Sequence, residues 1–293
     1  MKKIVYTLLF LCSNLITSSQ VTSYYFESKD AFVEYPFLKY SSKEEIPVKV
    51  MPSVDVNKLL QEDKANEGLD IPFRFGYGFD VDYTLKDGVW EEQDGKRIWS
   101  LRVFSDGAYS INFIFSKLAL SPQAELYIYS PDGRMVYGAV TAEQNIPDGF
   151  NSFLTDLVAG DEVIIRLFEP SIAKETSSLV ISRVVHAYIN MFPGNDESST
   201  QLMALTCHNN VACYPNWEKE SNGVALILLS TGDYWCSGSL INNTYQNKNP
   251  LFLTAFHCVD VYSPHGSIDG VEIARAQNWG YRFNYKTTTC DGS

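Results

Sequence analysis

The residue pair His257-Cys258 is the part of this sequence best suited to chemistry. It lies in a stretch from Asp233 to Asp260 in which two short apolar runs, Cys236 to Ile241 and Leu251 to Ala255, flank a polar loop. A histidine beside a cysteine is compatible with a metal site, with a thiol nucleophile and its base, or with a histidine base whose neighbour has a structural role.

The spacing of the surrounding residues favours the third possibility. A metal site needs three or four ligands at paired spacing, whereas the other cysteines near the C-terminus are scattered singly. Adjacent residues on a strand point to opposite faces, so Cys258 is poorly placed to use His257 as its base. We therefore predict a histidine at a strand end with a disulfide behind it. A lone histidine is more often a hydrogen-bonded core residue, and these residues alone leave that alternative open.

The start of the chain predicts export. Lys2 and Lys3 precede an apolar run from Ile4 to Cys12 and a small polar stretch that ends at Gln20, which is the pattern of a cleaved secretory signal over residues 1–20. The apolar run is shorter than the roughly 20 residues that span a bilayer. We expect no membrane insertion after cleavage and a secreted, periplasmic or cell-surface location; a membrane anchor or a lipoprotein is the alternative.

Export makes disulfides the default for the remaining cysteines. The chain has six cysteines, and loss of the leader with Cys12 leaves five in the last third: Cys207, Cys213, Cys236, Cys258 and Cys290. Five cannot all pair within one chain. One cysteine is therefore a free thiol, is bonded to another molecule, or lacks its partner in this sequence.

The composition excludes several classes of protein. With 45% hydrophobic and 20% charged residues, the chain is too balanced for a disordered protein, and 293 residues suggest about two domains. A net charge of −12 without a basic cluster argues against nucleic acid as a partner. Gly76 and Gly78 lack the spacing of a phosphate-binding loop. Asp80 and Asp82 supply only two carboxylates, which is too few for a calcium site, and we interpret them as solvent-facing strand positions.

Short strands separated by turns such as Asp106-Gly107 dominate the middle of the chain. Apolar residues alternate with other residues along several of these strands, so each strand can offer one face to a core. These alternating residues are Trp99, Leu101 and Val103; Leu126 and Ile128; and Val163, Ile165 and Leu167. The pattern predicts a β-sandwich over residues 71–192.

Three further regions surround the predicted sandwich. A polar segment over residues 21–70 precedes it and contains a weak helical pattern from Val56 to Glu67. The stretch from Ile189 to Thr200 is the best linker candidate, and we place the linker at residues 193–205 because it holds Pro193, Gly194 and an acidic, serine-rich tail. The second unit, residues 206–293, holds all the cysteines that remain after the leader.

Three sets of residues resemble a known family. LTAFHC, ending in His257-Cys258, with CSGSL upstream, resembles the strand end that carries the catalytic histidine in trypsin-like serine proteases of the chymotrypsin fold. CHNNVAC, GSLINNT and the run from Tyr285 to Cys290 are similar to the bacterial lysyl endopeptidase branch in particular. SDGAYSIN and LYIYSPDG resemble the β-sandwich that precedes the catalytic domain in such precursors, so the resemblance covers roughly residues 95 to 293.

The resemblance implies an all-β chain: a β-sandwich prodomain followed by the first, incomplete β-barrel of a two-barrel trypsin-like protease. His257 is then the general base. The implied disulfides are Cys236–Cys258 and Cys213–Cys290, and Cys207 is left with a partner outside the sequence. His186, His208 and His265 have no comparable surroundings, and His186 is expected to be structural.

The aspartate and serine of a catalytic triad are not assigned. Asp260 and Asp269 are too close to His257, and the terminal Asp291-Gly292-Ser293 has the wrong order for the family's Gly-Asp-Ser-Gly element. We expect this chain to be the N-terminal portion of an exported serine endopeptidase precursor, and we expect the chain by itself to be inactive.

The complete protein is expected to be a monomer that hydrolyses proteins or peptides, after lysine if it follows the branch, without a metal or other cofactor. The alternative is a non-catalytic exported binding or adhesion protein in which a decayed protease half follows the sandwich.

Overall fold

The computed structural model describes residues 21–26, 45–146, 152–172, 176–192, 209–245, 247, 249–261, 267–287 and 289–290. The predicted leader, the predicted linker over residues 193–205, Cys207, His208, His265 and the terminal Asp291-Gly292-Ser293 lie outside these residues. Among the described helices, none has both the length and the apolar character needed to cross a membrane.

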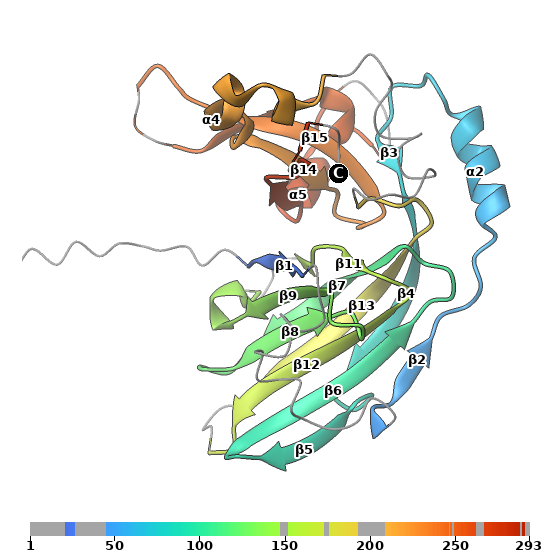
Figure 1. Ribbon diagram of the computed structural model, residues 1–293, viewed down its shortest axis with the longest axis vertical. Coiled ribbons are helices and arrows are strands. Elements are labelled where there is room, and N and C mark those ends of the chain that lie inside the picture. The colour runs from blue at the N-terminus through green and yellow to red at the C-terminus, as the bar shows by residue number, and fades with distance from the viewer. Residues whose placement is uncertain are drawn as a thin grey trace, which may run out of the picture.

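The structure is mainly β and contains three sheets (Figure 1). The strands of the first sheet are β1 Ser23–Tyr25, β2 Val48–Val50, β5 Val89–Gln93, β6 Lys96–Phe104, β8 Glu125–Tyr129, β9 Met135–Val140 and β12 Glu162–Pro170. They follow the order β1-β9-β8-β12-β6-β2, with β5 also paired to β6.

The second sheet consists of β4 Gly76–Thr84, β7 Ser110–Ala119, β10 Phe153–Leu154, β11 Val158–Ala159 and β13 Ser178–Ala187. Its order is β10-β7-β13-β4, with β11 paired to β7. The third sheet consists of β3 Phe73–Arg74, β14 Val224–Leu228, β15 Tyr234–Ile241, β16 Leu251–Thr254 and β17 Gly280–Phe283. Its order is β16-β15-β14-β17, with β3 paired to β15.

The described helices are short. The α-helices are α2 Val56–Ala65, α4 Glu218–Ser221 and α5 Gly270–Ala276; the 3-10 helices are η3 Ala142–Gln144, η4 Val211–Cys213, η5 Pro215–Trp217 and η6 Phe256–Cys258. The weak helical pattern of the polar segment is thus confirmed as α2. Asp55 caps this helix by accepting a hydrogen bond from the backbone N–H of Lys58 at 3.1 Å.

The first two sheets enclose one buried core, which makes them the two layers of a sandwich. Every residue of the predicted apolar alternation on β6, β8 and β12 lies in this core, together with Phe113 of β7 and Val184 of β13. Ile98 and Phe168, on the opposite faces of β6 and β12, belong to a separate outer cluster. The period-two pattern therefore identified the inward face correctly.

The predicted polar segment, residues 21–70, is part of this fold. β1 pairs antiparallel with β9, and β2 pairs parallel with β6. The sequence did not show these strands because each has only three residues, which is too short for a period to be recognised, and two of the three are exposed.

The glycine-containing run on β4 has a structural explanation. Asp80 and Asp82 lie at exposed positions, as predicted. A side chain at Gly78 would overlap the guanidinium group of Arg183, and one at Gly76 would approach Val185 too closely. These glycines leave room for the side chains of Arg183 and Val185 on β13 to lie across β4.

The third sheet lies beyond one end of the sandwich (Figure 1), and the two share an apolar cluster. Leu228 and Trp235 belong to the same apolar cluster as Phe75 and Tyr188. The backbone N–H groups of Phe75 and Gly76 donate to the carbonyl oxygen of Asp233 at 3.0 and 3.2 Å. In the described residues this sheet is open, and the predicted barrel stays a prediction.

The beginning of the linker candidate is buried, contrary to the sequence interpretation of Ile189 to Thr200. Ile189 and Met191 are 4% and 0% exposed and belong to the cluster shared with the third sheet. The backbone N–H groups of Tyr188 and Ile189 both donate to the carbonyl oxygen of Phe75. The chain therefore stays attached to the core up to Phe192, the last described residue before the predicted linker.

Candidate functional site

Two antiparallel strands, β15 and β16, position His257. They pair from Ile241 opposite Leu251 to Gly238 opposite Thr254, which confirms the two predicted apolar strands. The Thr254 hydroxyl donates to the carbonyl oxygen of Ser237 at 2.8 Å and closes the end of the pair. The chain then turns into η6, which carries His257 directly after the strand end.

A disulfide fixes this turn to the sheet. Cys258, which is 2% exposed, is bonded to Cys236 of β15, with Cα atoms 6.2 Å apart. The two sulfurs and a ring nitrogen of His257 lie within 4.8 Å of one another, a spacing that would suit a metal ion. The two sulfurs are bonded to each other in the disulfide, so neither is a thiolate that could bind a metal ion. The chemistry of this cluster is thus that of a histidine held by a disulfide.

Nδ1 of His257 lies in close contact with the carboxylate of Asp70. The His257 side chain is 29% exposed and that of Asp70 is 87% exposed. A carboxylate at one imidazole nitrogen fixes the orientation and tautomer of the ring and leaves the other nitrogen for proton transfer. Sequence reasoning missed Asp70, because it lies in the polar segment far upstream of the histidine.

Strand β3 brings Asp70 to this position. Phe73 and Arg74 pair with Trp235 and Tyr234 of β15, so the backbone before Phe73 runs along β15 towards its disulfide. The rings of Phe73 and Trp235 are in edge contact, with centroids 5.6 Å apart. This short strand therefore connects the polar segment to the sheet that carries the histidine.

Helix α2 holds β3 in place through a shared carboxylate. Arg74 Nε donates to Asp63 at 2.8 Å, and a second Arg74 nitrogen donates to the Leu59 carbonyl oxygen at 3.1 Å. The Tyr188 hydroxyl donates to the other oxygen of Asp63 at 2.6 Å. Burial, reinforced by this hydrogen bond, raises the pKa of Tyr188 well above its usual range, so the hydroxyl remains a donor.

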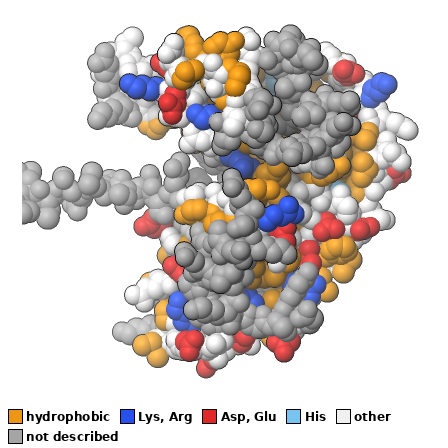
Figure 2. Space-filling view, viewed as in Figure 1, with side chains coloured by type: hydrophobic (Ala, Val, Ile, Leu, Met, Phe, Trp, Pro, Cys, Tyr) orange, Lys and Arg blue, Asp and Glu red, His pale blue; other side chains and the backbone are white. Residues whose placement is uncertain are grey.

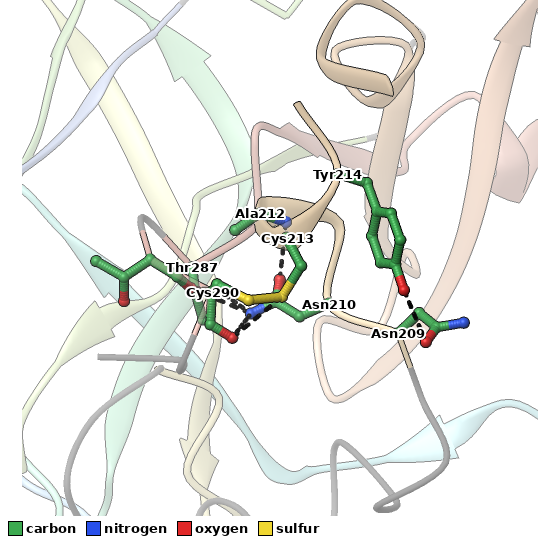
Figure 3. Close-up of a disulfide and its surroundings, with 8 residues drawn as sticks. Asn209, Asn210, Ala212, Cys213, Tyr214, Thr287 and Cys290 are labelled. Atoms are coloured by element: carbon green, nitrogen blue, oxygen red, sulfur yellow. Dashed lines mark hydrogen bonds between the residues drawn. A yellow bond between two sulfur atoms is a disulfide. The ribbon is translucent and has the colours of Figure 1, made fainter. Parts of the chain in front are cut away.

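A second disulfide joins the two ends of the C-terminal unit (Figure 3). Cys213 of η4 is bonded to Cys290, with Cα atoms 4.6 Å apart. Asn210 braces this bond: its amide nitrogen donates to the Thr287 hydroxyl at 2.8 Å and to the Cys290 carbonyl oxygen at 3.3 Å, while its Oδ1 accepts from Ala212 N at 3.0 Å. Both pairs are those implied by the family resemblance.

Within the described residues, Asp260 and Asp269 follow His257 in the sequence. Asp269 caps α5 by accepting hydrogen bonds from the backbone of Val271 and Glu272 at 2.8 and 2.9 Å. Asp260 is 6% exposed, and its own N–H donates to the carbonyl oxygen of Phe256 at 3.1 Å. The carboxylate in contact with Nδ1 of His257 is that of Asp70.

His186 lies in the sandwich core, where a structural histidine was expected. It is 1% exposed, and its Nδ1 is 2.8 Å from the Ser105 hydroxyl. Burial lowers the pKa of His186, which keeps the ring neutral at physiological pH. A side chain enclosed in this way has no route to a substrate.

Residues 203–293 match the family described as the lysyl endopeptidase C-terminal domain. The matched range contains His257 and both disulfides and lies wholly after the sandwich. The C-terminal unit is thus related to lysyl endopeptidase through that domain.

Proposed function

We propose that this C-terminal unit belongs to the catalytic domain of an exported serine endopeptidase and that His257 is its general base. The position of His257 carries the proposal: it lies in a disulfide-fixed turn at a strand end, in a segment related to lysyl endopeptidase. A histidine held in this way has the geometry that proton transfer requires.

In the proposed reaction, Nε2 of His257 takes the proton of a serine hydroxyl while the oxygen attacks the peptide carbonyl carbon. The protonated imidazole then gives that proton to the leaving amine, and water hydrolyses the acyl-enzyme by the same route. This chemistry proceeds without a metal or organic cofactor. The serine and the aspartate of the triad are not assigned within this sequence.

The substrates in this proposal are proteins or peptides, with cleavage after lysine as the family description suggests. Two disulfides are consistent with an exported protein. On the face shown in Figure 2, basic side chains are interspersed with acidic ones, which supports a partner other than nucleic acid. The sandwich is proposed to be a prodomain or folding aid for the unit that it contacts.

The test is His257→Ala in the protein secreted from the natural gene, assayed on peptide amides with lysine before the cleaved bond. We expect kcat to fall at least about a thousandfold, because loss of a triad base leaves only binding and oxyanion stabilisation. His265→Ala is the matched control, since that histidine lies outside the TAFHC motif.

Secretion and both disulfides should be normal in both variants, as shown by immunoblot and mass spectrometry. Near-normal hydrolysis by His257→Ala would refute the assignment. The codons after Ser293 give an independent test: an aspartate and a Gly-x-Ser-Gly element support the protease, whereas a stop codon leaves the binding or adhesion protein as the better interpretation.

A further inference from the structure

We propose that residues 70–74 form an intramolecular strap that occupies Nδ1 of His257 and keeps the histidine out of its catalytic arrangement. The contact between Asp70 and His257 is given by the structure. The regulatory effect that we propose for this contact rests on the proposed function. Three observations carry the inference: the path of β3 along β15, the attachment of Arg74 to α2, and the exposure of Asp70.

The path of the strap follows from strand pairing. β14 occupies one edge of β15 from Trp235 to Ser239. A strand has two edges, so β3 and β16 share the other: β3 pairs at Tyr234 and Trp235, and β16 pairs from Gly238 onward. The chain leaves this edge after Thr254, at the end of β16. The strap and the histidine turn therefore meet along the same edge of β15.

Charged and apolar contacts at the far end of the strap hold it there. Arg74, which is 19% exposed, pairs with Asp63 and Glu62 of α2 at 2.7 and 3.1 Å. The ring of Phe73 packs against Trp235 in the cluster shared by the sandwich and the third sheet. An exposed ion pair contributes little alone, so the contact of Asp70 with His257 depends on these attachments.

The exposure of Asp70 indicates that this residue belongs to a strap and is not a catalytic carboxylate. A triad carboxylate acts from a buried site, where its charge is not screened by water. Asp70 is 87% exposed, so water and salt screen its charge. Because Nδ1 binds one carboxylate at a time, a buried triad aspartate can reach it only after the strap has left. The precursor is therefore held in a state of low activity.

The first test reads the tautomer of His257 in the whole chain by long-range ¹H–¹⁵N NMR of ¹⁵N-histidine-labelled protein, at a pH where the ring is neutral. In the wild type we expect Nδ1 to carry the proton donated to Asp70. Asp70→Ala should move His257 to the Nε2–H form, and Asp82→Ala, an exposed acid on β4, should leave it unchanged. An identical spectrum of His257 in wild type and Asp70→Ala would overturn the proposal.

The second test measures hydrogen exchange of the strap by mass spectrometry. Arg74→Ala removes the attachment to α2, and we expect exchange of the backbone amides at positions 73 and 74 to speed up about tenfold, because charge-assisted hydrogen bonds are lost. Arg134→Ala is the control, since Arg134 pairs with the nearby Asp132 and its side chain is 60% exposed. Equal exchange in the two variants would contradict the strap.

Both readouts are independent of hydrolysis, so failure of the strap and failure of the proposed function are distinguishable. If Arg74→Ala fails to fold, Asp70→Ala still tests the proposal, because Asp70 is exposed and its replacement should leave folding intact. Where the natural gene product hydrolyses peptides, Asp70→Ala should raise the kcat of the precursor about two- to threefold. A large fall in kcat would instead make Asp70 a positioning residue for His257 and overturn the strap.

Discussion

Gly238 lies in β15 opposite Thr254, at the end of the strand pair that positions His257. A Cβ atom there would overlap the ring of Phe252 and the carbonyl oxygen of Leu253. We predict that Gly238→Ala lowers the free energy of unfolding by about 1–3 kcal/mol, because it overpacks a strand contact. Urea unfolding followed by tryptophan fluorescence would measure the change.

Gly270→Ala is the matched control for this substitution. Gly270 begins α5 and has no atom within 4 Å of the position that a Cβ would take. Alanine favours helix formation, so stability should stay the same or rise by less than about 1 kcal/mol. Equal losses in the two variants would contradict the packing argument.

The site was only partly predictable at the scale of single residues. His257, Cys236 and Cys258 lie within a short stretch, so local motif and strand period identified the histidine and its structural neighbour. Asp70 was not predictable, because its contact with His257 exists only after β3 has paired with β15. No pattern in a polar segment encodes a pairing with a distant strand.

Among the strands, the short edge strand β2 depends on a charged contact. Lys49 of β2 donates to Asp87 at 2.8 Å, and the other oxygen of Asp87 accepts from the Thr84 backbone at 2.8 Å. The hydrogen bond from Lys49, followed by that from Thr84, lowers the pKa of Asp87 in the folded protein. The ionised carboxylate therefore stabilises the fold above its unfolded pKa of about 4, and this contribution is lost as the pH falls.

We predict that Asp87→Asn lowers the free energy of unfolding by up to about 1 kcal/mol at pH 7. The difference from wild type should shrink towards zero between about pH 4 and pH 2, because protonation removes the same charge. Denaturant titrations at several pH values would measure it, with Asp82→Asn on the neighbouring strand as the control. A difference that grows on acidification would have the wrong sign for this mechanism.

The elements differ in how well the sequence predicts them. β6, β8 and β12 are long enough for apolar alternation to mark their inward faces. β3 has two residues and no period, and its place is set by the partners of Phe73 and Arg74. Helix α5 was missed although a signal was present: Asp269 and Glu272 form a capping box that begins it.

The sandwich and the third sheet share an apolar cluster, which makes their stabilities interdependent across the whole molecule. Leu228 of β14 is 2% exposed in this cluster, together with Leu154 and Tyr188 of the sandwich. We predict that Leu228→Ala lowers the free energy of unfolding by about 2–5 kcal/mol. Hydrogen exchange should accelerate together in peptides from β13 and β15.

Leu253→Ala is the control, because Leu253 is 60% exposed at the end of the third sheet. This change should alter stability by less than about 0.5 kcal/mol. Faster exchange in the third sheet alone after Leu228→Ala would indicate that the two units unfold independently.

The composition of the chain predicted a division between two units, and the packing shows how closely they are joined. Pro193, Gly194 and the acidic tail favoured a boundary, and the cysteines gathered beyond it. The core of the third sheet was not predictable from those signals, since Trp235 contacts Phe73, at the start of the predicted sandwich, and Tyr285 donates to the Met191 carbonyl oxygen. Amino-acid composition indicates which segments are polar, but it does not indicate which apolar residues, far apart in the sequence, pack into one cluster.

The two disulfides are nested, because the Cys236–Cys258 link lies inside the segment closed by Cys213 and Cys290. The loop between β15 and β16 lies inside both rings and is exposed, with Tyr245 at 87%. A single peptide-bond cut in that loop would leave a molecule of two chains that stay covalently tethered at two points. Such a nicked molecule would keep His257 and its supporting strand together for as long as the bonds remain oxidised.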